Sequence, residues 1–381
     1  MSFCVPDLLT CQCIFEISIQ FTSANFFYKN AWDKLNLIGI TGTKGKSTTA
    51  YYIKYILDEY LAQMGGKESG LASTLEIYDG IVRKPSTLTT PEPFELHKHF
   101  DNAVKSGTDF FTMEVSSQAL KYGRTEGVNF KIGCYLNIGI DHISANEHPD
   151  FEDYFTSKMK LFTQCNTAVI NLDSDLSERV VEYSKNAKKV ITFSTKNPQA
   201  DIYGYNIHKD SSETVFSVKT DKFECEFRLS MPGLFNVENA LCAIGVAYVL
   251  GVSPEHIYNG LYKSKTEGRM EIYESENKKI AVIGGHRRYS DICAKRWQGV
   301  LDAMNAHNLP IDPELDYATV YFSPEGGCTG ATELLRRGRE FTALFTMSDL
   351  ISIGAFRALK DRGLEVPGDV SVIGFDGLPV G

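Results

Sequence analysis

A short apolar segment that runs directly into a glycine-rich loop constrains the fold of this chain more than any other feature. Residues 35–41 read LNLIGIT, and residues 41–49 read TGTKGKSTT. Tyrosine and isoleucine side chains then recur with helical spacing between residues 47 and 61. A buried strand, a glycine turn and a helix in this order bring backbone N–H groups to a helix N-terminus, an arrangement that binds phosphate groups. The segment therefore predicts an α/β domain with a phosphate-binding loop.

The residue types within the loop indicate how a nucleotide would be held. Lys46 is expected to reach the outer phosphates, and Ser47 to offer its hydroxyl to Mg²⁺. The standard pattern has glycine five residues before Gly45, whereas position 40 is Ile, so this is the shorter T-G-T-x-G-K-[ST] form. The alternative is a glycine-rich turn in which Gly-Lys-Ser occurs by chance. The predicted nucleotide-binding residues of the loop are Gly42, Thr43, Lys44, Gly45, Lys46, Ser47 and Thr48.

The composition is that of a globular protein. The chain has 381 residues, 43% hydrophobic and 23% charged, which is enough for roughly two to three domains. Its formal net charge of −9 argues against binding to the phosphate backbone of a nucleic acid. No apolar run reaches about 18 residues, so we expect no transmembrane helix and no membrane partner.

Cysteine usage and the N-terminus favour a cytoplasmic location. The nine cysteines are an odd number, thinly spread, which is not typical of a disulfide framework. Cys4, Cys11 and Cys13 lack nearby partners at zinc-site spacing. The first residues carry Asp7 and Glu16 and no basic stretch, so we expect no signal peptide.

The order of the predicted elements indicates two α/β domains. After the loop, strand-like segments alternate with helix-like ones, which favours a mostly parallel sheet with helices on both faces. The predicted strands are 109–117, 132–138, 167–173 and 188–194. Residues 200–229 alternate apolar and polar side chains, which predicts antiparallel strands at a sheet edge, and helices are expected at 235–250 and 254–263.

A second, shorter alternation of predicted strands and helices begins at residue 278. The expected strands are 278–285, 317–323, 341–347 and 370–376, and the expected helices are 290–306, 330–338 and 349–362.

Seven blocks follow the loop in a fixed order, and together with it they resemble the Mur ligases, the ATP-dependent amino-acid ligases of peptidoglycan synthesis. The blocks are TLTTPEP (87–93), MEVSSQAL (113–120), NIGIDHI (137–143), YFTSKMKLF (154–162), INLDSD (170–175), PGLFNVENALCAI (232–244) and EGRMEIYE (267–274). The most similar subfamily is UDP-N-acetylmuramoyl-tripeptide synthetase, which adds the third residue of the stem peptide.

The resemblance implies a chemistry. ATP phosphorylates a carboxylate and an amine then attacks the acyl phosphate, which requires ATP and Mg²⁺ as cofactors. The partners would be small molecules, a UDP-muramoyl peptide and an amino acid. Lys46 and Lys158 would be catalytic, and Lys158 is the lysine that the resemblance expects to be carbamylated. A carbamate turns this cation into an anionic oxygen ligand, whereas neighbouring Lys160 is expected to be an ordinary solvated lysine.

The remaining site residues are also implied by the resemblance alone. Ser47, Glu114, His142 and Lys158 would hold metal; Asn236, Asn239 and Arg269 would contact the nucleotide; and Thr89, Thr90, Ser116 and Ser117 would lie near the muramoyl peptide. Asparagines and short hydroxyl clusters at such places also serve as helix caps and turns.

The resemblance covers only the middle of a three-domain family. We expect residues 1–34 to be a remnant of the UDP-sugar domain and its linker, and 35–275 to be the central ATP-binding domain. After IAVI, an Asp-Tyr-Ala-His block is expected, but the sequence reads GGHRRYSD.

Residues 279–381 instead resemble an incomplete effector-binding subdomain of LacI/GalR-type regulators, a periplasmic-binding-protein-like half-domain. The possible effector contacts are Arg296, Asp349 and Asp376. Ser348 stands where many members of that family carry Asn.

The leading interpretation is therefore a Mur-ligase ATP-binding domain joined to a foreign half-domain. By lineage it is an ADP-forming acid–amino-acid ligase, and in this chimera-like chain we expect nucleotide binding without completed ligation. The alternative is a sugar-sensing fragment, and the EVSSQAL and LTTPEP blocks point away from a folylpolyglutamate synthase-type ligase. A natural fusion, an engineered chimera and an assembly artefact would all produce this pattern.

Overall fold

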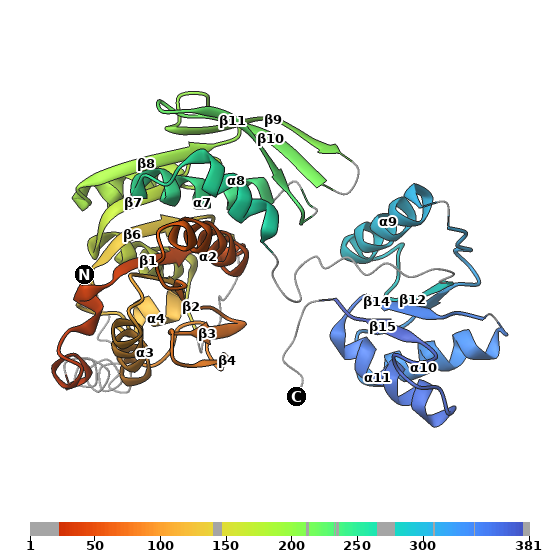
Figure 1. Cartoon of the computed structure of the whole chain (residues 1–381). Coiled ribbons are helices and arrows are strands. Elements are labelled where there is room, and N and C mark those ends of the chain that lie inside the picture. The colour runs from red at the N-terminus through yellow and green to blue at the C-terminus, as the bar shows by residue number, and fades with distance from the viewer. Residues whose placement is uncertain are drawn as a thin grey trace, which may run out of the picture. The chain divides into compact units, whose positions relative to one another are not determined.

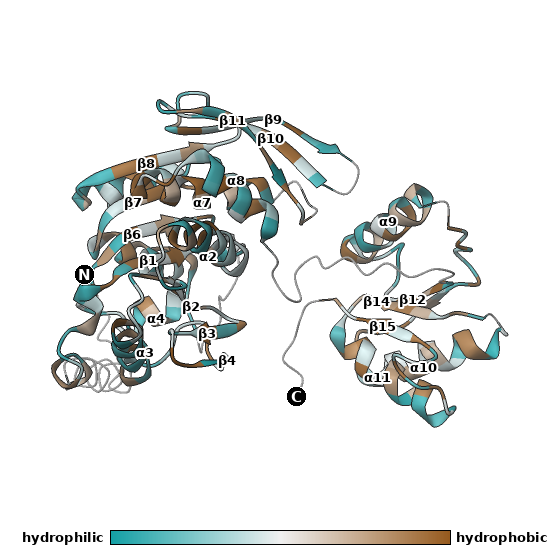
Figure 2. Ribbon diagram, in the orientation of Figure 1, coloured by the Kyte–Doolittle hydropathy of each residue, from teal (hydrophilic) through white to brown (hydrophobic). Residues whose placement is uncertain are grey.

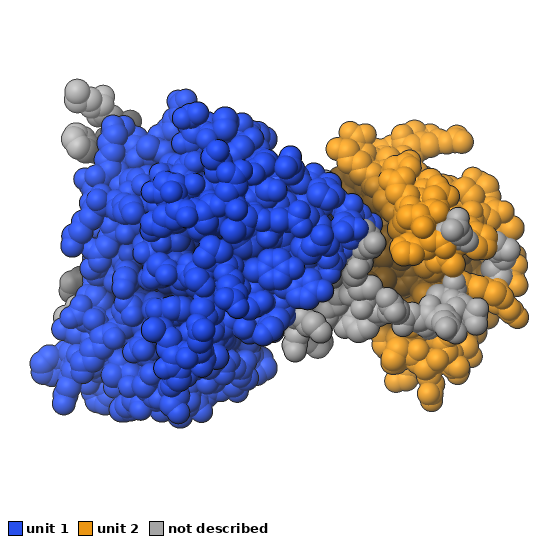
Figure 3. Space-filling view, turned by 45° about the horizontal axis from the view of Figure 1, so that its top comes forward, with its two compact units in different colours: residues 1–271 blue, residues 272–381 orange. Residues whose placement is uncertain are grey.

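The structure, a computed structural model, describes residues 23–139, 147–210, 213–231, 233, 236–264, 279–307, 309–338 and 340–375. The chain divides into two compact units, residues 1–271 and 272–381 (Figure 3). In the described residues, no helix has the length and apolar character needed to cross a membrane. The six cysteines in the described residues are all free thiols.

Unit 1 is built on an eleven-stranded sheet, counted over the described residues, with the order β11-β10-β9-β8-β7-β6-β1-β5-β2-β3-β4 (Figure 1). The strands are β1 (Asn36–Thr41), β2 (Gly70–Ala72), β3 (Glu76–Tyr78), β4 (Arg83–Pro85), β5 (Phe110–Glu114), β6 (Phe130–Tyr135), β7 (Cys165–Asn171), β8 (Lys189–Ser194), β9 (Ile202–Asp210), β10 (Glu213–Lys219) and β11 (Glu224–Leu229). The strands from β2 through β5, β1, β6, β7 and β8 to β9 are parallel, and both ends of the sheet are antiparallel.

Helices cover both faces of this sheet. One face carries α2 (Lys46–Gln63), α7 (Asn236–Leu250) and α8 (Pro254–Lys263). The other carries η1 (Ala31–Lys34), α3 (Pro93–Ser106), α4 (Ser117–Lys121), α5 (Phe151–Met159), η2 (Lys160–Thr163), α6 (Ser177–Tyr183) and η3 (Ser184–Asn186). The alternation along β1 explains the two layers, because Ile38 and Ile40 enter the first core while Leu37 enters the second.

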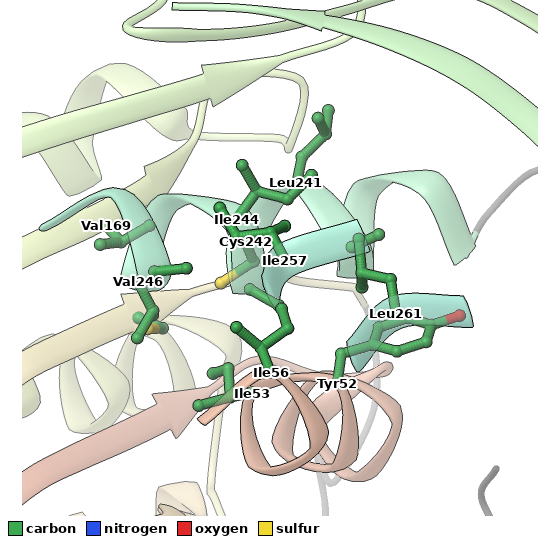
Figure 4. Packing of buried hydrophobic residues seen from close by; sticks show 14 of the residues in the cluster. Tyr52, Ile53, Ile56, Val169, Leu241, Cys242, Ile244, Val246, Ile257 and Leu261 are labelled. Atoms are coloured by element: carbon green, nitrogen blue, oxygen red, sulfur yellow. The ribbon is translucent and has the colours of Figure 1, made fainter. Parts of the chain in front are cut away.

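The first core shows how tightly the phosphate-loop helix is held. Ile53 and Ile56 of α2 point toward Cys242 and Ile257 (Figure 4). Gly260 of α8 lies against the backbone of α2, since a Cβ there would be 2.6 Å from the Ile56 nitrogen. Hydropathy colouring marks apolar residues along α7 and the central strands of unit 1 (Figure 2), and residues of α2, α7 and α8 share one buried cluster with them. The start of α2 is therefore fixed relative to α7 by packing.

Unit 2 has a four-stranded parallel sheet in the described residues, with the order β13-β12-β14-β15. Its strands are β12 (Ile280–Gly284), β13 (Tyr317–Thr319), β14 (Ala343–Thr346) and β15 (Ser371–Ile373), and its helices are α9 (Asp291–Ala306), α10 (Pro324–Arg336) and α11 (Asp349–Asp361). Helix α9 packs on one face through Trp297, and α10 and α11 pack on the other through Leu334 and Leu359.

These elements confirm the α/β architecture expected from the sequence, including the edge strands β9–β11. Two details differ. The short strands β2–β4 were not predicted, because three-residue strands show no period. Helix α10 begins at Pro324 and not at residue 330, since Ser323 caps it by accepting a hydrogen bond of 3.0 Å from the Gly326 amide.

Glycines also form the contact between α10 and α11. Those in the first turns of α10 are poor helix formers, which is why the sequence predicted a start six residues too late. A Cβ on Gly327 would collide with the carbonyl oxygen of Ile351, and one on Gly354 would collide with that of Pro324. The two helices therefore approach at backbone distance, which explains why poor helix formers occupy these positions.

We predict that Gly354→Ala destabilises unit 2 by about 1–3 kcal/mol, because the added methyl group forces the helices apart. The matched control is Gly299→Ala in α9, where nothing lies within 4 Å of the new Cβ and a gain of about 0.5–1 kcal/mol is expected. Denaturant unfolding followed by Trp297 fluorescence in a Trp32→Phe background measures both. Equal stability of Gly354→Ala and the parent would contradict the contact.

Candidate functional site

The candidate site lies where the parallel strands of unit 1 end. β1 sits between β5 and β6, with Ile40 opposite Glu114 and Thr41 opposite Tyr135. From β1 the chain first adds strands on the β5 side of the sheet and then, from β6 onward, on the other side, so the strand order reverses at β1. Ligands of parallel α/β sheets bind beyond the carboxyl ends of the strands at such a point.

The glycine loop between β1 and α2 is shaped by contact with α7. Gly45, which precedes α2, has φ +85°, a conformation that L side chains rarely adopt. A Cβ at this position would also collide with the Asn239 side-chain oxygen. Asn236 and Asn239 are buried in the first turn of α7 and joined by a hydrogen bond of 3.3 Å. The sequence-predicted Asn236 and Asn239 are thus brought to the loop.

A third asparagine, which the sequence reasoning missed, contacts the loop from the other side. Asn137 follows β6, and its Oδ1 accepts hydrogen bonds from the amides of Thr43 (3.1 Å) and Lys44 (2.9 Å). Its Nδ2 donates to the Lys44 carbonyl oxygen at 3.1 Å. The available signal was its place directly after a predicted strand, at the start of NIGIDHI.

The start of α2 offers donors to an anion. The first hydrogen bond between successive turns of the helix runs from the Thr49 amide to the Gly45 carbonyl at 2.9 Å. The preceding amides of Ser47 and Thr48 have no carbonyl one turn earlier within the helix, and the helix dipole makes this end positive. The loop therefore fits a phosphate group.

Two lysines meet at one carbonyl oxygen of the loop. The Lys46 ammonium donates to Gly42 O at 2.9 Å and to Thr43 O at 3.2 Å. The Lys158 ammonium donates to the same Gly42 oxygen at 3.1 Å and lies 4.4 Å from the centre of the Tyr154 ring. Lys158 is only 2% exposed, although it comes from α5 on the far face of the sheet. These two positive side chains would favour a bound anion here.

Lys160 lies away from this site, as its spacing from Lys158 predicted. It is exposed and donates to the Lys121 carbonyl at 3.3 Å.

Glu114 supplies a buried carboxylate beside the loop. Its two oxygens accept hydrogen bonds from Thr74, from the amide at 2.8 Å and from the hydroxyl at 3.2 Å. Thr74, which the sequence reasoning missed, follows β2 and reaches the same edge. Within the described residues, no group of three or more His, Cys, Asp or Glu side chains could hold a metal.

A single carboxylate at the carboxyl edge of β5, next to β1, still fits Mg²⁺, which usually keeps waters and takes its other ligands from substrate phosphates. His142 and Arg269 lie outside the described residues.

The predicted substrate-facing hydroxyls gather at the end of β5. The Thr90 hydroxyl donates to the Glu114 carbonyl at 3.0 Å and accepts from the Ser116 amide at 3.0 Å. The Thr89 hydroxyl lies 3.2 Å from the Thr74 hydroxyl. Ser116 also caps α4, because its side chain accepts from the Ala119 amide at 3.1 Å. These residues therefore have structural roles in addition to any role in binding.

Two of the predicted effector residues of unit 2 come together at its own carboxyl edge. Arg296 of α9 donates to the Met347 carbonyl, and its guanidinium lies 3.9 Å from the centre of the Phe375 ring. The amide of Asp349, at the start of α11, donates to the Phe375 carbonyl at 3.1 Å. The Ser348 side chain caps this helix, and Asp376 lies outside the described residues.

Comparison with known families agrees with this geometry. Residues 40–247 match the Mur ligase middle domain. The chain belongs to the Mur ligase family. Residues 272–380 separately match a periplasmic binding protein-like domain. This match confirms the predicted periplasmic-binding-protein-like half-domain in the C-terminal part of the chain.

Several curated relatives are Mur ligases. The chain is 36% identical over 262 residues to UDP-N-acetylmuramoyl-L-alanyl-D-glutamate--2,6-diaminopimelate ligase of Clostridium perfringens, covering 68% of the chain and 52% of the relative. It is 36% identical over 271 residues to the corresponding L-lysine ligase of Enterococcus faecalis, covering 70% and 53%. The chain thus spans about half the length of the curated relatives it matches.

Solved structures show the same fold. A UDP-N-acetylmuramoyl-L-alanyl-D-glutamate--2,6-diaminopimelate ligase has a TM-score of 0.63 at 18% identity, covering 93% of this chain and 72% of its own. The MurF ligase from Thermotoga maritima, solved in complex with ADP, has a TM-score of 0.55 at 15% identity, covering 89% and 85%.

Proposed function

We propose that unit 1 binds Mg²⁺-ATP at residues 42–48 and descends from an ATP-dependent amino-acid ligase of peptidoglycan precursor synthesis. The observation that carries the proposal is the loop itself, a glycine turn that leads into the positive end of α2 with Lys46 folded over it. A relative of the same fold is solved with ADP, which supports a nucleotide as the ligand.

The residues at the site then take defined roles. Lys46 would bind the outer phosphates, and Ser47 and Glu114 would hold Mg²⁺. His142 would hold a second Mg²⁺, and a carbamylated Lys158 would offer a further oxygen ligand to metal. Asn236, Asn239 and Arg269 would contact the nucleotide. ATP would supply the phosphoryl group that activates a carboxylate, while Mg²⁺ would offset the charge on the phosphates.

The carboxylate substrate proposed for this chain is the muramoyl dipeptide. The names of the relatives specify UDP-N-acetylmuramoyl-L-alanyl-D-glutamate. Thr89, Thr90, Ser116 and Ser117, which surround the end of β5, would face this substrate. The amine that joins it is diaminopimelate in one relative and L-lysine in another.

We further propose the domain boundaries 1–34, 35–275 and 279–381 from the sequence blocks.

Unit 2 carries the second candidate function, binding of a small sugar-like effector. The specific support is the convergence of Arg296 and Asp349 at the carboxyl edge of its parallel sheet, where ligands of such sheets bind.

Lys46→Ala is expected to weaken Mg²⁺-ATP binding by more than tenfold, because it removes a charge-assisted hydrogen-bond donor worth about 1.5–3 kcal/mol. Isothermal titration of the full chain measures this. Lys98→Ala, an exposed lysine on α3, is the control and should bind like the parent. Unchanged affinity in a folded Lys46→Ala protein would refute the nucleotide assignment.

Lys158 is expected to be carbamylated in the presence of CO₂ and Mg²⁺, when its neutral amine adds to CO₂ and loses a proton. A carbon-13 carbamate signal from labelled CO₂ should disappear in Lys158→Ala and persist in Lys160→Ala, whose exposed side chain lies in the adjoining turn. The absence of a protein-bound carbamate signal in the parent would count against this role.

The chain is expected to hydrolyse ATP slowly and to form no tripeptide from UDP-N-acetylmuramoyl-L-alanyl-D-glutamate, ATP and lysine or diaminopimelate. Orienting the reactants contributes up to about 7–11 kcal/mol. The block expected to seat the amine is replaced by GGHRRYSD, in a segment that matches another family. Tripeptide formed roughly once per second, as by a working enzyme, would show this reasoning to be wrong.

A further inference from the structure

A cluster outside the nucleotide loop joins a serine, a histidine and an aspartate. The Ser117 hydroxyl lies 3.0 Å from His148 Nε2, and His148 Nδ1 lies 2.6 Å from Asp153 Oδ2. The His148 side chain is fully buried. In the described residues, this is the one hydrogen bond found for the Ser117 hydroxyl.

The segment that carries His148 is joined to α4 by three further hydrogen bonds. Lys121 donates to the Glu147 carbonyl at 2.9 Å and to Asp153 Oδ2 at 2.8 Å. Gln118 donates to the Glu147 side chain at 3.3 Å. Three side chains of one short helix therefore hold residues 147–153, so the orientation of the imidazole is well determined.

The groups around His148 define which of its nitrogens carries the proton. Burial lowers the pKa of His148, and the nearby charge of Lys121 acts in the same direction, although Asp153 opposes them. Burial alone would raise the pKa of Asp153, but hydrogen bonds from Lys121 and His148 outweigh it and leave that pKa below its ordinary value. Near neutral pH a neutral imidazole therefore faces a carboxylate.

A carboxylate only accepts hydrogen bonds, so the proton of His148 must reside on Nδ1. Nε2 is then an acceptor, and the Ser117 hydroxyl must donate its proton to it. What Ser117 offers to a ligand is consequently its lone pairs and not its proton. Such an oxygen attracts an N–H group and repels a carboxylate.

We propose that Ser117, positioned by His148 and Asp153, recognises a peptide N–H of the muramoyl dipeptide and not its carboxylates. The inference rests on the proposed function for the identity of the ligand. It also rests on placement, because Ser117 follows directly on Ser116, which binds Thr90 at the end of β5. Asp153 and His148 would be positioning residues that act through Ser117.

The first test needs no ligand. Nitrogen-15 NMR of the histidine-labelled full chain at neutral pH should show a protonated Nδ1 and an unprotonated Nε2 for His148. In Asp153→Ala, Nδ1 loses the carboxylate that accepts its proton, so the fraction of His148 protonated on Nδ1 should fall. A protonated Nε2 in the parent protein would overturn the proposal.

The second test uses UDP-N-acetylmuramoyl-L-alanyl-D-glutamate and two ester analogues, each with one peptide N–H replaced by oxygen. One of the two esters should bind the parent chain about threefold to tenfold more weakly than UDP-N-acetylmuramoyl-L-alanyl-D-glutamate itself. That difference should vanish in Ser117→Ala and become smaller in Asp153→Ala, both checked for folding by thermal melting.

The assignment is overturned if replacing the peptide N–H by oxygen weakens binding by the same factor in the parent and in Ser117→Ala. If no muramoyl peptide binds the parent, the inference and the proposed substrate both fail. ATP binding that depends on Lys46 would in that case leave the nucleotide part of the function standing.

Discussion

Hydrogen bonding of β1 on both of its edges determines where everything else in the site lies. Because β5 and β6 flank it in parallel, the residues that follow these strands meet the glycine loop. Glu114 ends one neighbouring strand and Asn137 follows the other. A shift of either pairing by one residue would turn these side chains to the opposite face of the sheet. The site is thus a consequence of strand register, which the two buried cores enforce.

Helix α5 connects the two parts of the site. Tyr154 contacts the nucleotide loop, since its hydroxyl lies 3.0 Å from the Thr43 hydroxyl, and its ring packs against the His148 ring at 5.1 Å. Lys158 reaches the loop from the same helix, while Asp153 orients His148 toward Ser117. A shift of α5 would therefore move the groups at the glycine loop and the groups around Ser117 together, which would couple the two ligands proposed for these places.

The residue pattern by itself predicted the part of the site that is contiguous in the chain, whereas Glu114, Lys158, Asn236 and Asn239 were implied only by the family resemblance. The strand, loop and helix around residues 42–48 were predictable from the glycines of the loop and the helical spacing of the apolar residues after it. Helical spacing also predicted that Lys158 and Lys160 lie on different faces, and the structure has Lys158 buried and Lys160 exposed. Asn137, Thr74 and His148 were missed because each is polar, stands alone in a loop and gains its role only when distant strands pair. No local pattern records such a contact.

The central claim is that this chain holds a nucleotide at the carboxyl edge of β1. The most direct measurement is a crystal structure of the full chain grown with Mg²⁺ and a non-hydrolysable ATP analogue. The triphosphate should lie against the amides of residues 42–48 and the Lys46 ammonium, with the metal between it, Ser47 and Glu114. An empty loop in crystals where the analogue occupies another site, such as the edge of the sheet in unit 2, would contradict the account.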